Sequence, residues 1–467
     1  MGSRISKLKL TKYNYLDLAI LLFGIIFLVF LVIVSYSVRP CSDDIYFYSE
    51  FLDKGWFFSI WQMGTNIRFT GFLVFNTLCL LVGDFQDFPI IFFVFYLSLF
   101  SFLLFSTHQL IKTILTYFFQ AENVPFLKFL NLSLLFISVF YFSTINAQEV
   151  WFWTIATSIY LLPIPLIFLS ISELIRFKSK WSYLTVGILF FLIGGMVENL
   201  VLSFISLLLL VVLFNWLKSR KVDWRIPILI PSMLVLPLLS VFHSGLGKRI
   251  KNEAYYSVEN GFFKSLYSDY VLGLNYNRLI IILFILILVF YTANSLRTYL
   301  IQPFWNLKKT IVLSIIILIL TFLTTFIPMF SVYGNFGPAR ASLPFFFVLI
   351  LIIIFWTFIL GLKYHIKNSY FIPVSIVANL MIGIFTFNQQ IKTSQFALEY
   401  DNRVKEIKKK KLHKGSFLVA KPLPDSGVIP SQELNKFGET PAMTSYYLGR
   451  VNGINKDIYL DTSFLKK

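Results

Sequence analysis

The sequence is poor in charge and almost without cysteine. Only 14% of its 467 residues are charged, 57% are hydrophobic, and its mean hydropathy is +0.74. A soluble domain of this composition would expose large apolar patches, so a soluble protein is excluded. Two cysteines, Cys41 and Cys79, can build neither a disulfide framework nor a cysteine-based zinc site. We expect two free thiols, with a single Cys41–Cys79 bridge as the alternative.

Histidine and acidic residues are also scarce, and no internal repeat is evident. The four histidines are too dispersed to form a metal-binding cluster. The missing repeat argues against a transporter built from paired halves. Acidic residues number 23 against 41 basic ones, which gives a net charge of +18. Because the basic residues fall mostly between apolar runs, we interpret them as determinants of membrane orientation and not as a nucleic-acid-binding surface.

Long apolar runs are what the chain has in abundance. Many windows reach the roughly 20 apolar residues that a helix needs to cross a bilayer. The run at 69–83 is short and interrupted by Asn76, so we interpret it as an interfacial or re-entrant helix. Without it, the sequence predicts an all-α polytopic membrane protein with about 11 transmembrane helices. These spans are expected at 14–38, 88–111, 128–146, 150–175, 182–195, 199–217, 226–243, 278–297, 310–330, 341–362 and 369–388.

The distribution of basic residues predicts the orientation. With the N-terminus in the cytoplasm, eighteen basic residues fall in cytoplasmic segments, nine in outer loops and fourteen in the C-terminal tail. Counting 69–83 as a span would move the basic clusters at 176–180 and 218–225 outside, against the positive-inside rule. We therefore expect the N-terminus in the cytoplasm and the C-terminus outside.

The chain is expected to divide into a membrane module, 1–388, and an extracytoplasmic C-terminal segment, 389–467. The segment opens with a charged helical pattern from Glu399 to Lys411. A strand-like run follows at Ser416–Ala420. Because the segment has few apolar side chains, it can form only a small domain.

Carboxylates at the outer end of the first span mark a candidate site. Asp43 and Asp44 lie in an otherwise apolar stretch, and their desolvation is costly without a use in chemistry or ion binding. Helix capping is the alternative interpretation. The outer loops also collect Glu149, which is close to two tryptophans, the Glu198–Asn199 pair, and the basic residues Arg68, Lys248, Arg249 and Arg340.

Each of these residues also has a structural interpretation. Glu149 could belong to an interfacial girdle and Glu198 could serve structural hydrogen bonding. Arg340 could extend to the surface from a helix end, and Lys248 and Arg249 could belong to a solvated loop.

One span followed by a large outer loop, which opens with an acidic pair and carries amphipathic helices, resembles the GT-C superfamily of integral-membrane glycosyltransferases. The closer likeness is to bacterial members of cell-surface polysaccharide pathways. The resemblance is carried by Ser42–Tyr46, Glu149, Tyr160, Glu198 and Arg340, and by the tail patterns Asp401–Arg403, Val419–Leu423 and Ser445–Gly449. Many members have aspartate where this chain has Glu149.

The resemblance implies a bacterial plasma-membrane enzyme that moves a sugar from a polyprenyl-phosphate donor to a cell-envelope glycan or glycolipid acceptor, with inversion. An acceptor hydroxyl is a poor nucleophile and needs a base, and a leaving phosphate needs cations. It implies three catalytic carboxylates, Asp43, Asp44 and Glu149, with Asp43 or Asp44 as the base. The implied substrate-binding residues are Arg340, Arg68, Lys248, Arg249, Tyr160, Glu198 and Asn199. Whether Asp43 and Asp44 bind Mg²⁺ or Mn²⁺ stays open.

Three other classes remain as alternatives. A transporter or lipid flippase would need charges buried within the spans, and the sequence offers Asp17, Glu198 and little else. A polymerase or ligase of lipid-linked polysaccharide would use arginines in outer loops, such as Arg249 and Arg340. A non-catalytic scaffold is the third.

Overall fold

The protein is a bundle of apolar helices, and eight of those that the structure describes are long and apolar enough to cross a membrane. The computed structural model describes residues 15–63, 68–145, 147–177, 179–219, 224–241, 276–300, 307–333, 339–410, 417–420, 423–428 and 457–460. The predicted helical membrane protein is therefore confirmed. The eight candidate spans are formed by α1 (Tyr15–Ser37), α4 (Phe88–Phe118), α5 (Phe126–Ser143), α7 with α8 (Thr154–Tyr160 and Pro163–Arg176), α14 (Tyr276–Leu296), α15 (Leu307–Tyr333), α16 (Leu343–Lys363) and α17 (Phe371–Lys410).

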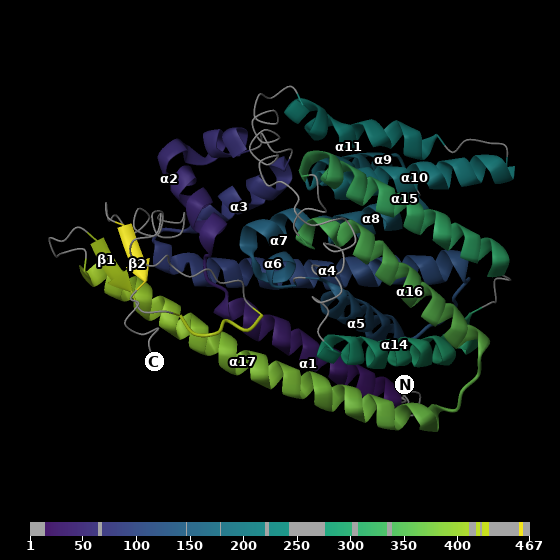
Figure 1. The fold of residues 1–467 in the computed structure, drawn as a ribbon. Helices are drawn as coiled ribbons and strands as arrows, with labels where there is room; N and C mark the ends of the chain where they lie inside the picture. The colour runs from purple at the N-terminus through teal and green to yellow at the C-terminus, as the bar shows by residue number, and fades with distance from the viewer. Residues whose placement is uncertain are drawn as a thin grey trace, which may run out of the picture.

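Four further helices are apolar over shorter described stretches, at 69–81, 180–194, 198–213 and 225–238. They are α3 (Phe69–Leu81), α9 (Lys180–Gly194), α10 (Glu198–Ser219) and α11 (Arg225–Val241). The 13 residues of α3 rise about 20 Å, less than the ~30 Å hydrocarbon core, as expected for a helix that does not cross. Of the other three, α9 packs on α8, α10 packs on α15, and α11 packs on α9 and α10, which enlarges the bundle (Figure 1).

The apolar run predicted as one span at 150–175 is broken into three helices. These are α6 (Ala147–Phe152), α7 and α8. Trp153 has an extended backbone, with φ −92° and ψ 108°, and separates α6 from α7. Proline has no N–H to donate, so Pro163 is tolerated at the first position of α8, where a new helix begins. Apolar composition alone did not reveal these breaks.

The predicted outer loop at 39–87 is helical. It contains α2 (Ser42–Met63), α3 and a short 3-10 helix, η3 (Phe85–Asp87). Gly55 has φ +74° and bends α2, a conformation that other residues rarely adopt. The two longer helices pack on each other, and α3 also packs on α7.

The helices α1 and α17 lie side by side and run in the same direction (Figure 1). Near their starts, the Asn379 amide donates to the Ala19 carbonyl at 3.0 Å. Near their ends, the Tyr400 hydroxyl donates to the Pro40 carbonyl at 2.8 Å. The start of α1 and the end of α17 therefore lie at opposite ends of the bundle.

The 40-residue helix α17 rises about 60 Å, roughly twice the hydrocarbon thickness. The predicted boundary at 388/389 thus falls within one continuous helix. The charged pattern from Glu399 forms its last part, as predicted. The predicted strand is β1 (Phe417–Ala420), which pairs in parallel with β2 (Asp457–Leu460). Three further 3-10 helices flank the longer ones. They are η5 (Arg297–Tyr299) after α14, η6 (Ala339–Ser342) before α16 and η7 (Asn368–Tyr370) before α17.

The core is built from aromatic side chains around α5, which is buried along most of its length. Tyr141 contacts the rings of Phe30 and Trp151 at centroid distances of 5.3 and 5.1 Å. The Trp151 indole also donates to the Thr144 hydroxyl at 3.2 Å. This packing fixes the short helix α6, which carries Glu149, against the rigid centre of the bundle.

Candidate functional site

The two adjacent aspartates have different environments. Asp44 is fully buried, and its carboxylate accepts hydrogen bonds from the backbone N–H of Cys41 at 3.2 Å and of Ile155 at 3.0 Å. Cys41 precedes α2 and Ile155 lies in the first turn of α7, so one side chain caps two helices. The capping interpretation therefore describes Asp44.

Asp43 is only half-buried and has no such backbone partners among the described residues. Burial raises the pKa of its carboxyl above the ordinary value; Arg340 opposes this shift and Glu149 adds to it. Burial also raises the pKa of Asp44, to about 7, although the two N–H donors favour its charged form. Asp43 is the member of the pair that can meet a ligand.

Glu149 and Arg340 form an ion pair at this end of the bundle. Arg340 Nη1 donates to Glu149 Oε2 at 2.6 Å, and the two side chains are 26% and 25% exposed. The guanidinium also lies over the Trp153 ring, 5.1 Å from its centroid. Glu149 is on α6 and Arg340 on η6, directly before α16. Water, and hence a polar ligand, can reach both charges.

A second, looser pair lies beside the first. Arg68 Nη2 is 3.6 Å from Glu198 Oε2, and its guanidinium lies 5.9 Å from the centroid of the Tyr160 ring. Asn199, next to Glu198, donates to the carbonyl of Ala341 at 2.8 Å. Because Ala341 follows Arg340 in the chain, this hydrogen bond joins the start of α10 to the segment that carries Arg340.

Two glycines explain why Arg68 and Glu198 meet. A Cβ on Gly195 would lie 2.2 Å from Thr70 Oγ1, and one on Gly194 would lie 2.1 Å from the Met233 carbonyl oxygen. Only glycine lets the neighbouring helices α3 and α11 approach the end of α9 so closely. The backbone N–H of Thr70 donates to the Gly195 carbonyl at 2.8 Å, which sets Arg68 beside the next helix start.

Most of the sequence-predicted site residues thus gather in one place. Asp43, Glu149 and Arg340 interact electrostatically, and Arg340 is also within electrostatic reach of Arg68, which lies over the Tyr160 ring. Asp44 is buried and holds the starts of α2 and α7 together through its two backbone hydrogen bonds. Glu198 and Asn199 complete one side through the contacts above. Lys248 and Arg249 lie outside the described residues.

Two residues of the site were not predicted as site residues. Trp153 was noted only as one of the two tryptophans close to Glu149, and its position over Arg340 depends on the break between α6 and α7. Gln148 donates to the carbonyl of Gly427, 279 positions later, at 2.5 Å. Gly427 has φ +62° and packs against α17, and the Asp-Ser-Gly pattern before and at this position was the only local hint of a turn.

The predicted metal-binding role of the acidic pair fits the donor set poorly. Both Asp44 oxygens already accept backbone hydrogen bonds, so a cation shared by Asp43 and Asp44 would have to displace them. In the described part of the chain, no three His, Cys, Asp or Glu side chains gather around a common point. Cys41 and Cys79 are both buried as free thiols.

Comparisons with protein-family models, with curated proteins and with solved structures find no match to this chain. The site must therefore be interpreted from its own chemistry. It combines one half-buried carboxylate with a raised pKa, two partly exposed guanidinium groups, and aromatic side chains at the end of an apolar bundle. Such a site can remove a proton and stabilise an anion.

Proposed function

We propose that the protein is a GT-C-type integral-membrane glycosyltransferase. It would move a sugar from a polyprenyl-phosphate donor to a cell-envelope glycan or glycolipid acceptor at the outer face. The observation that carries the proposal is the half-buried Asp43 within electrostatic reach of Arg340, at one end of a bundle of apolar helices. An acceptor base and a phosphate-binding cation are the two groups that this transfer requires.

In the proposed reaction, Asp43 accepts the proton of the acceptor hydroxyl as the oxygen attacks the anomeric carbon. The bond between that carbon and the phosphate oxygen breaks, and the polyprenyl phosphate leaves with the electron pair. Direct displacement of this kind inverts the anomeric configuration. A raised pKa makes Asp43 a stronger base than an ordinary carboxylate, and half-burial still allows the hydroxyl to reach it.

Arg340 is the proposed ligand of the donor phosphate. Its guanidinium is held from one side by Glu149 and from another by the Trp153 ring, and about a quarter of the side chain is still exposed. Five N–H donors allow arginine to hold Glu149 and a phosphate together. Arg68 is the second cation that could turn toward the phosphate, because its pair with Glu198 is loose, at 3.6 Å.

We also propose that the chain crosses the membrane eleven times, with α9, α10 and α11 counted as spans. Successive contacts support this, because the starts and ends of the helices alternate between the Asp43 end and the Asp17 end of the bundle. With the N-terminus in the cytoplasm, the Asp43 end and the end of α17 face outward. The location would be the bacterial plasma membrane.

Cysteine labelling in intact cells tests this orientation. Both native cysteines are buried, so the parent chain should give little background. An impermeant maleimide should label Asp425→Cys, an exposed position next to the buried Ser426, and should not label Lys308→Cys at the start of α15. Labelling of Lys308→Cys alone would invert the proposed topology.

Donor binding and transfer by the purified protein test the function. Polyprenyl-phosphate-linked sugars are supplied as donors, with envelope glycolipid fractions as acceptors. Arg340→Ala should weaken donor binding, and Arg340→Lys, which keeps the charge but loses the bidentate fork, should be less impaired. Lys308→Ala, an exposed cation at the other end, is the matched control.

Two results would count against these roles. If Arg340→Ala binds the donor as tightly as the parent but fails in transfer, the phosphate role passes to another cation, with Arg68 first. If no sugar is transferred from any polyprenyl-phosphate donor, including lipid-linked oligosaccharides, the transferase proposal is wrong.

A further inference from the structure

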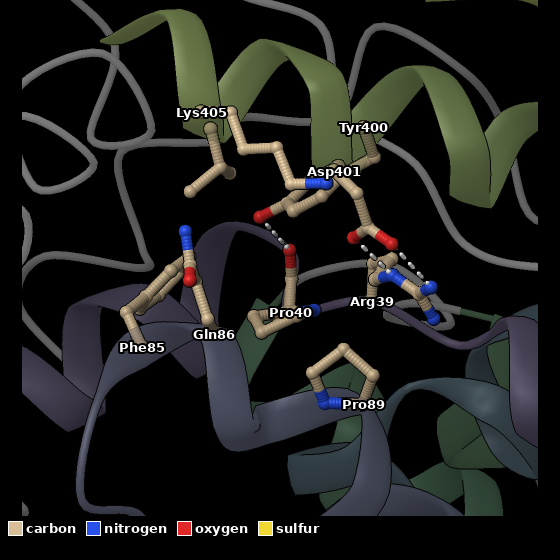
Figure 2. A pocket seen from close by; sticks show the side chains of 9 residues that line it. Arg39, Pro40, Phe85, Gln86, Pro89, Tyr400, Asp401 and Lys405 are labelled. Atoms are coloured by element: carbon tan, nitrogen blue, oxygen red, sulfur yellow. Dashed lines mark hydrogen bonds and ion pairs between the residues drawn. The ribbon is translucent and has the colours of Figure 1, made fainter. Parts of the chain in front are cut away.

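A separate pocket of about 220 Å³ lies where α1, α4 and α17 meet at the Asp43 end of the bundle (Figure 2). Its walls come from the residues that follow α1, from η3 and the first turn of α4, and from the outer part of α17. None of the proposed catalytic residues lines it. Nothing in the proposed transfer reaction uses it.

An ion pair whose arginine donates from all three guanidinium nitrogens forms one wall of this pocket. Arg39 Nε and Nη2 donate to the two oxygens of Asp401 at 2.7 and 2.8 Å, as Figure 2 shows. Its Nη1 donates to the carbonyls of Tyr36 and Val38 at 3.0 and 2.9 Å. Because Arg39 is only 6% exposed and is held by four hydrogen bonds from its three nitrogens, it builds the wall of the pocket and cannot turn toward a ligand.

Two polar side chains at the pocket remain available. Within the described residues, neither the Lys405 ammonium nor the Gln86 side-chain amide has a hydrogen bond or ion pair. Both line the pocket, one from α17 and one from η3, on opposite sides in Figure 2. The charges of Arg39 and Asp401 cancel, so Lys405 leaves the pocket with one positive charge. Two free donors and a net positive charge suit an oxyanion.

The floor and surroundings of the pocket are apolar. Pro40, Phe85 and Pro89 line it beneath the polar groups. One helical turn toward the middle of the bundle, the rings of Tyr36 and Phe93 contact each other at a centroid distance of 5.7 Å. From there a row of exposed apolar side chains follows one face of α1 at helical spacing: Tyr36, Val32, Val29, Ile25, Leu22 and Leu18.

A soluble anion would gain nothing from this row, whereas a lipid would. An amphipathic molecule could place a charged group beside Lys405 and its chains along α1 and α4, which contact each other. The pocket lies just beyond the last residue of α1, where the headgroups of a bilayer are expected. We propose that this pocket binds the phosphate headgroup of a membrane phospholipid.

The proposed lipid has a structural consequence. Its headgroup would contact α17 through Lys405 and η3 through Gln86, and would thereby fasten the outer part of α17 to the bundle. Any ligand that binds only the folded state stabilises it by mass action. The proposal does not depend on the transferase function, because it concerns binding and stability alone.

Lipid binding by the purified, delipidated full-length protein tests the proposal. Phosphatidylglycerol in mixed micelles is titrated, and retained lipid is measured by native mass spectrometry. Lys405→Gln should weaken binding roughly tenfold, the effect of losing one charged hydrogen bond. Gln86→Ala should weaken it roughly threefold. Lys308→Gln, an equally exposed lysine at the other end, should bind as the parent does.

Two further ligands separate the headgroup from its alternatives. Soluble glycerol phosphate should bind far more weakly than the lipid, because it lacks the chains that would lie on α1. Diacylglycerol, which lacks phosphate, should be insensitive to Lys405→Gln. Glycerol phosphate that binds as tightly as phosphatidylglycerol would show a site for soluble anions. Equal phosphatidylglycerol affinity in Lys405→Gln and the parent would overturn the headgroup site.

Discussion

The two ends of the helix bundle both carry ion pairs, but the pairs differ in their access to water. At one end, Lys128 Nζ lies 3.2 and 3.1 Å from the two carboxylate oxygens of Asp17 and donates to Ser295 Oγ at 2.8 Å. These side chains are 8% and 2% exposed. At the other end, Arg340 and Glu149 are each about a quarter exposed, and Asp43 lies beside them.

This difference separates a structural pair from a site. The Asp17–Lys128 pair joins α1 to α5, and the Asn131 amide strengthens the join by donating to the Asp17 carbonyl at 2.9 Å. Both carboxylate oxygens are engaged and solvent is excluded, so no substrate can enter. A flippase with charges buried in its spans was one alternative from the sequence. Asp17–Lys128 is the one such pair that the described helices bury. We call it closed, because no solvent reaches it, and this favours a structural role.

We call the end of the bundle that carries Asp43, Glu149 and Arg340 the open end, because these side chains are partly exposed. Replacing Asp43 should give the largest effect there. Asp43→Asn removes the proposed base and should lower transfer by roughly 10² to 10⁴, the usual contribution of general base catalysis. Because Asp43 is half-buried and caps no helix in the structure, the variant should unfold at the parent's temperature. The measurement is initial rate with the polyprenyl-phosphate donor, beside a thermal melt. Full activity in Asp43→Asn would show that Asp43 is not the base.

Breaking the closed pair should affect stability and leave chemistry intact. Lys128→Met leaves the buried Asp17 carboxylate without its cation and should cost roughly 3–5 kcal/mol of unfolding free energy. The double variant Asp17→Leu with Lys128→Met should recover much of this loss, because no buried charge remains. Denaturation of purified protein measures both, and transfer per folded molecule should stay at the parent's level. A single variant as stable as the parent would show that the pair is not a structural join.

Asp44 should make the stability of the open end depend on pH. Its pKa rises from 3.8 unfolded to about 7 folded, so the folded state favours the protonated form. This contribution, roughly 4 kcal/mol, is fully present below pH 4 and is lost as the pH rises through 7. In thermal melts between pH 5 and pH 8, the parent should lose more stability than Asp44→Asn. Parallel curves would assign the pH dependence to other groups.

The smallest expected effect is a shift in the pH dependence of transfer. Glu149 raises the pKa of Asp43, so Glu149→Gln should lower that pKa and move the acid limb of the rate profile to lower pH. Arg340 lowers the same pKa, and Arg340→Lys keeps the charge. This variant should therefore move the acid limb less than Glu149→Gln does. The measurement is kcat/KM across pH for the parent and both variants. A limb that moves to higher pH in Glu149→Gln would contradict the proposed base.

Local patterns were enough to predict much of the secondary structure. The apolar runs located α1, α4, α5 and the later spans, and the interruption at Asn76 marked α3 as short. The strand-like run at 416–420 and the charged helix before it were also found. Composition did not reveal the break at Trp153, where a single extended residue interrupts an unbroken apolar run, nor that α17 continues as one helix past residue 389. Both depend on what the backbone packs against.

For the candidate site, the sequence predicted the residue types and their gathering at one end of the bundle, but it did not predict how they pair. Asp43 and Asp44 are chemically identical neighbours. Only the arrival of Ile155, 111 positions later, decides that Asp44 is a buried cap and Asp43 an available base. The partners Glu149 and Arg340 are separated by 191 positions, and no local pattern links them.

By itself, the sequence determined that this is a helical membrane protein and singled out Asp43, Glu149 and Arg340, because hydrophobicity and charge are properties of the residues themselves. The tertiary structure decided which charged side chains are buried in an ion pair and which remain accessible to solvent. Asp17 and Asp43 are both carboxylates close to an end of α1, one near its start and the other just beyond its last residue. Burial against Lys128 makes one a structural join, and partial exposure beside Arg340 makes the other available for chemistry, because desolvation and pairing are set by neighbours far away in the chain.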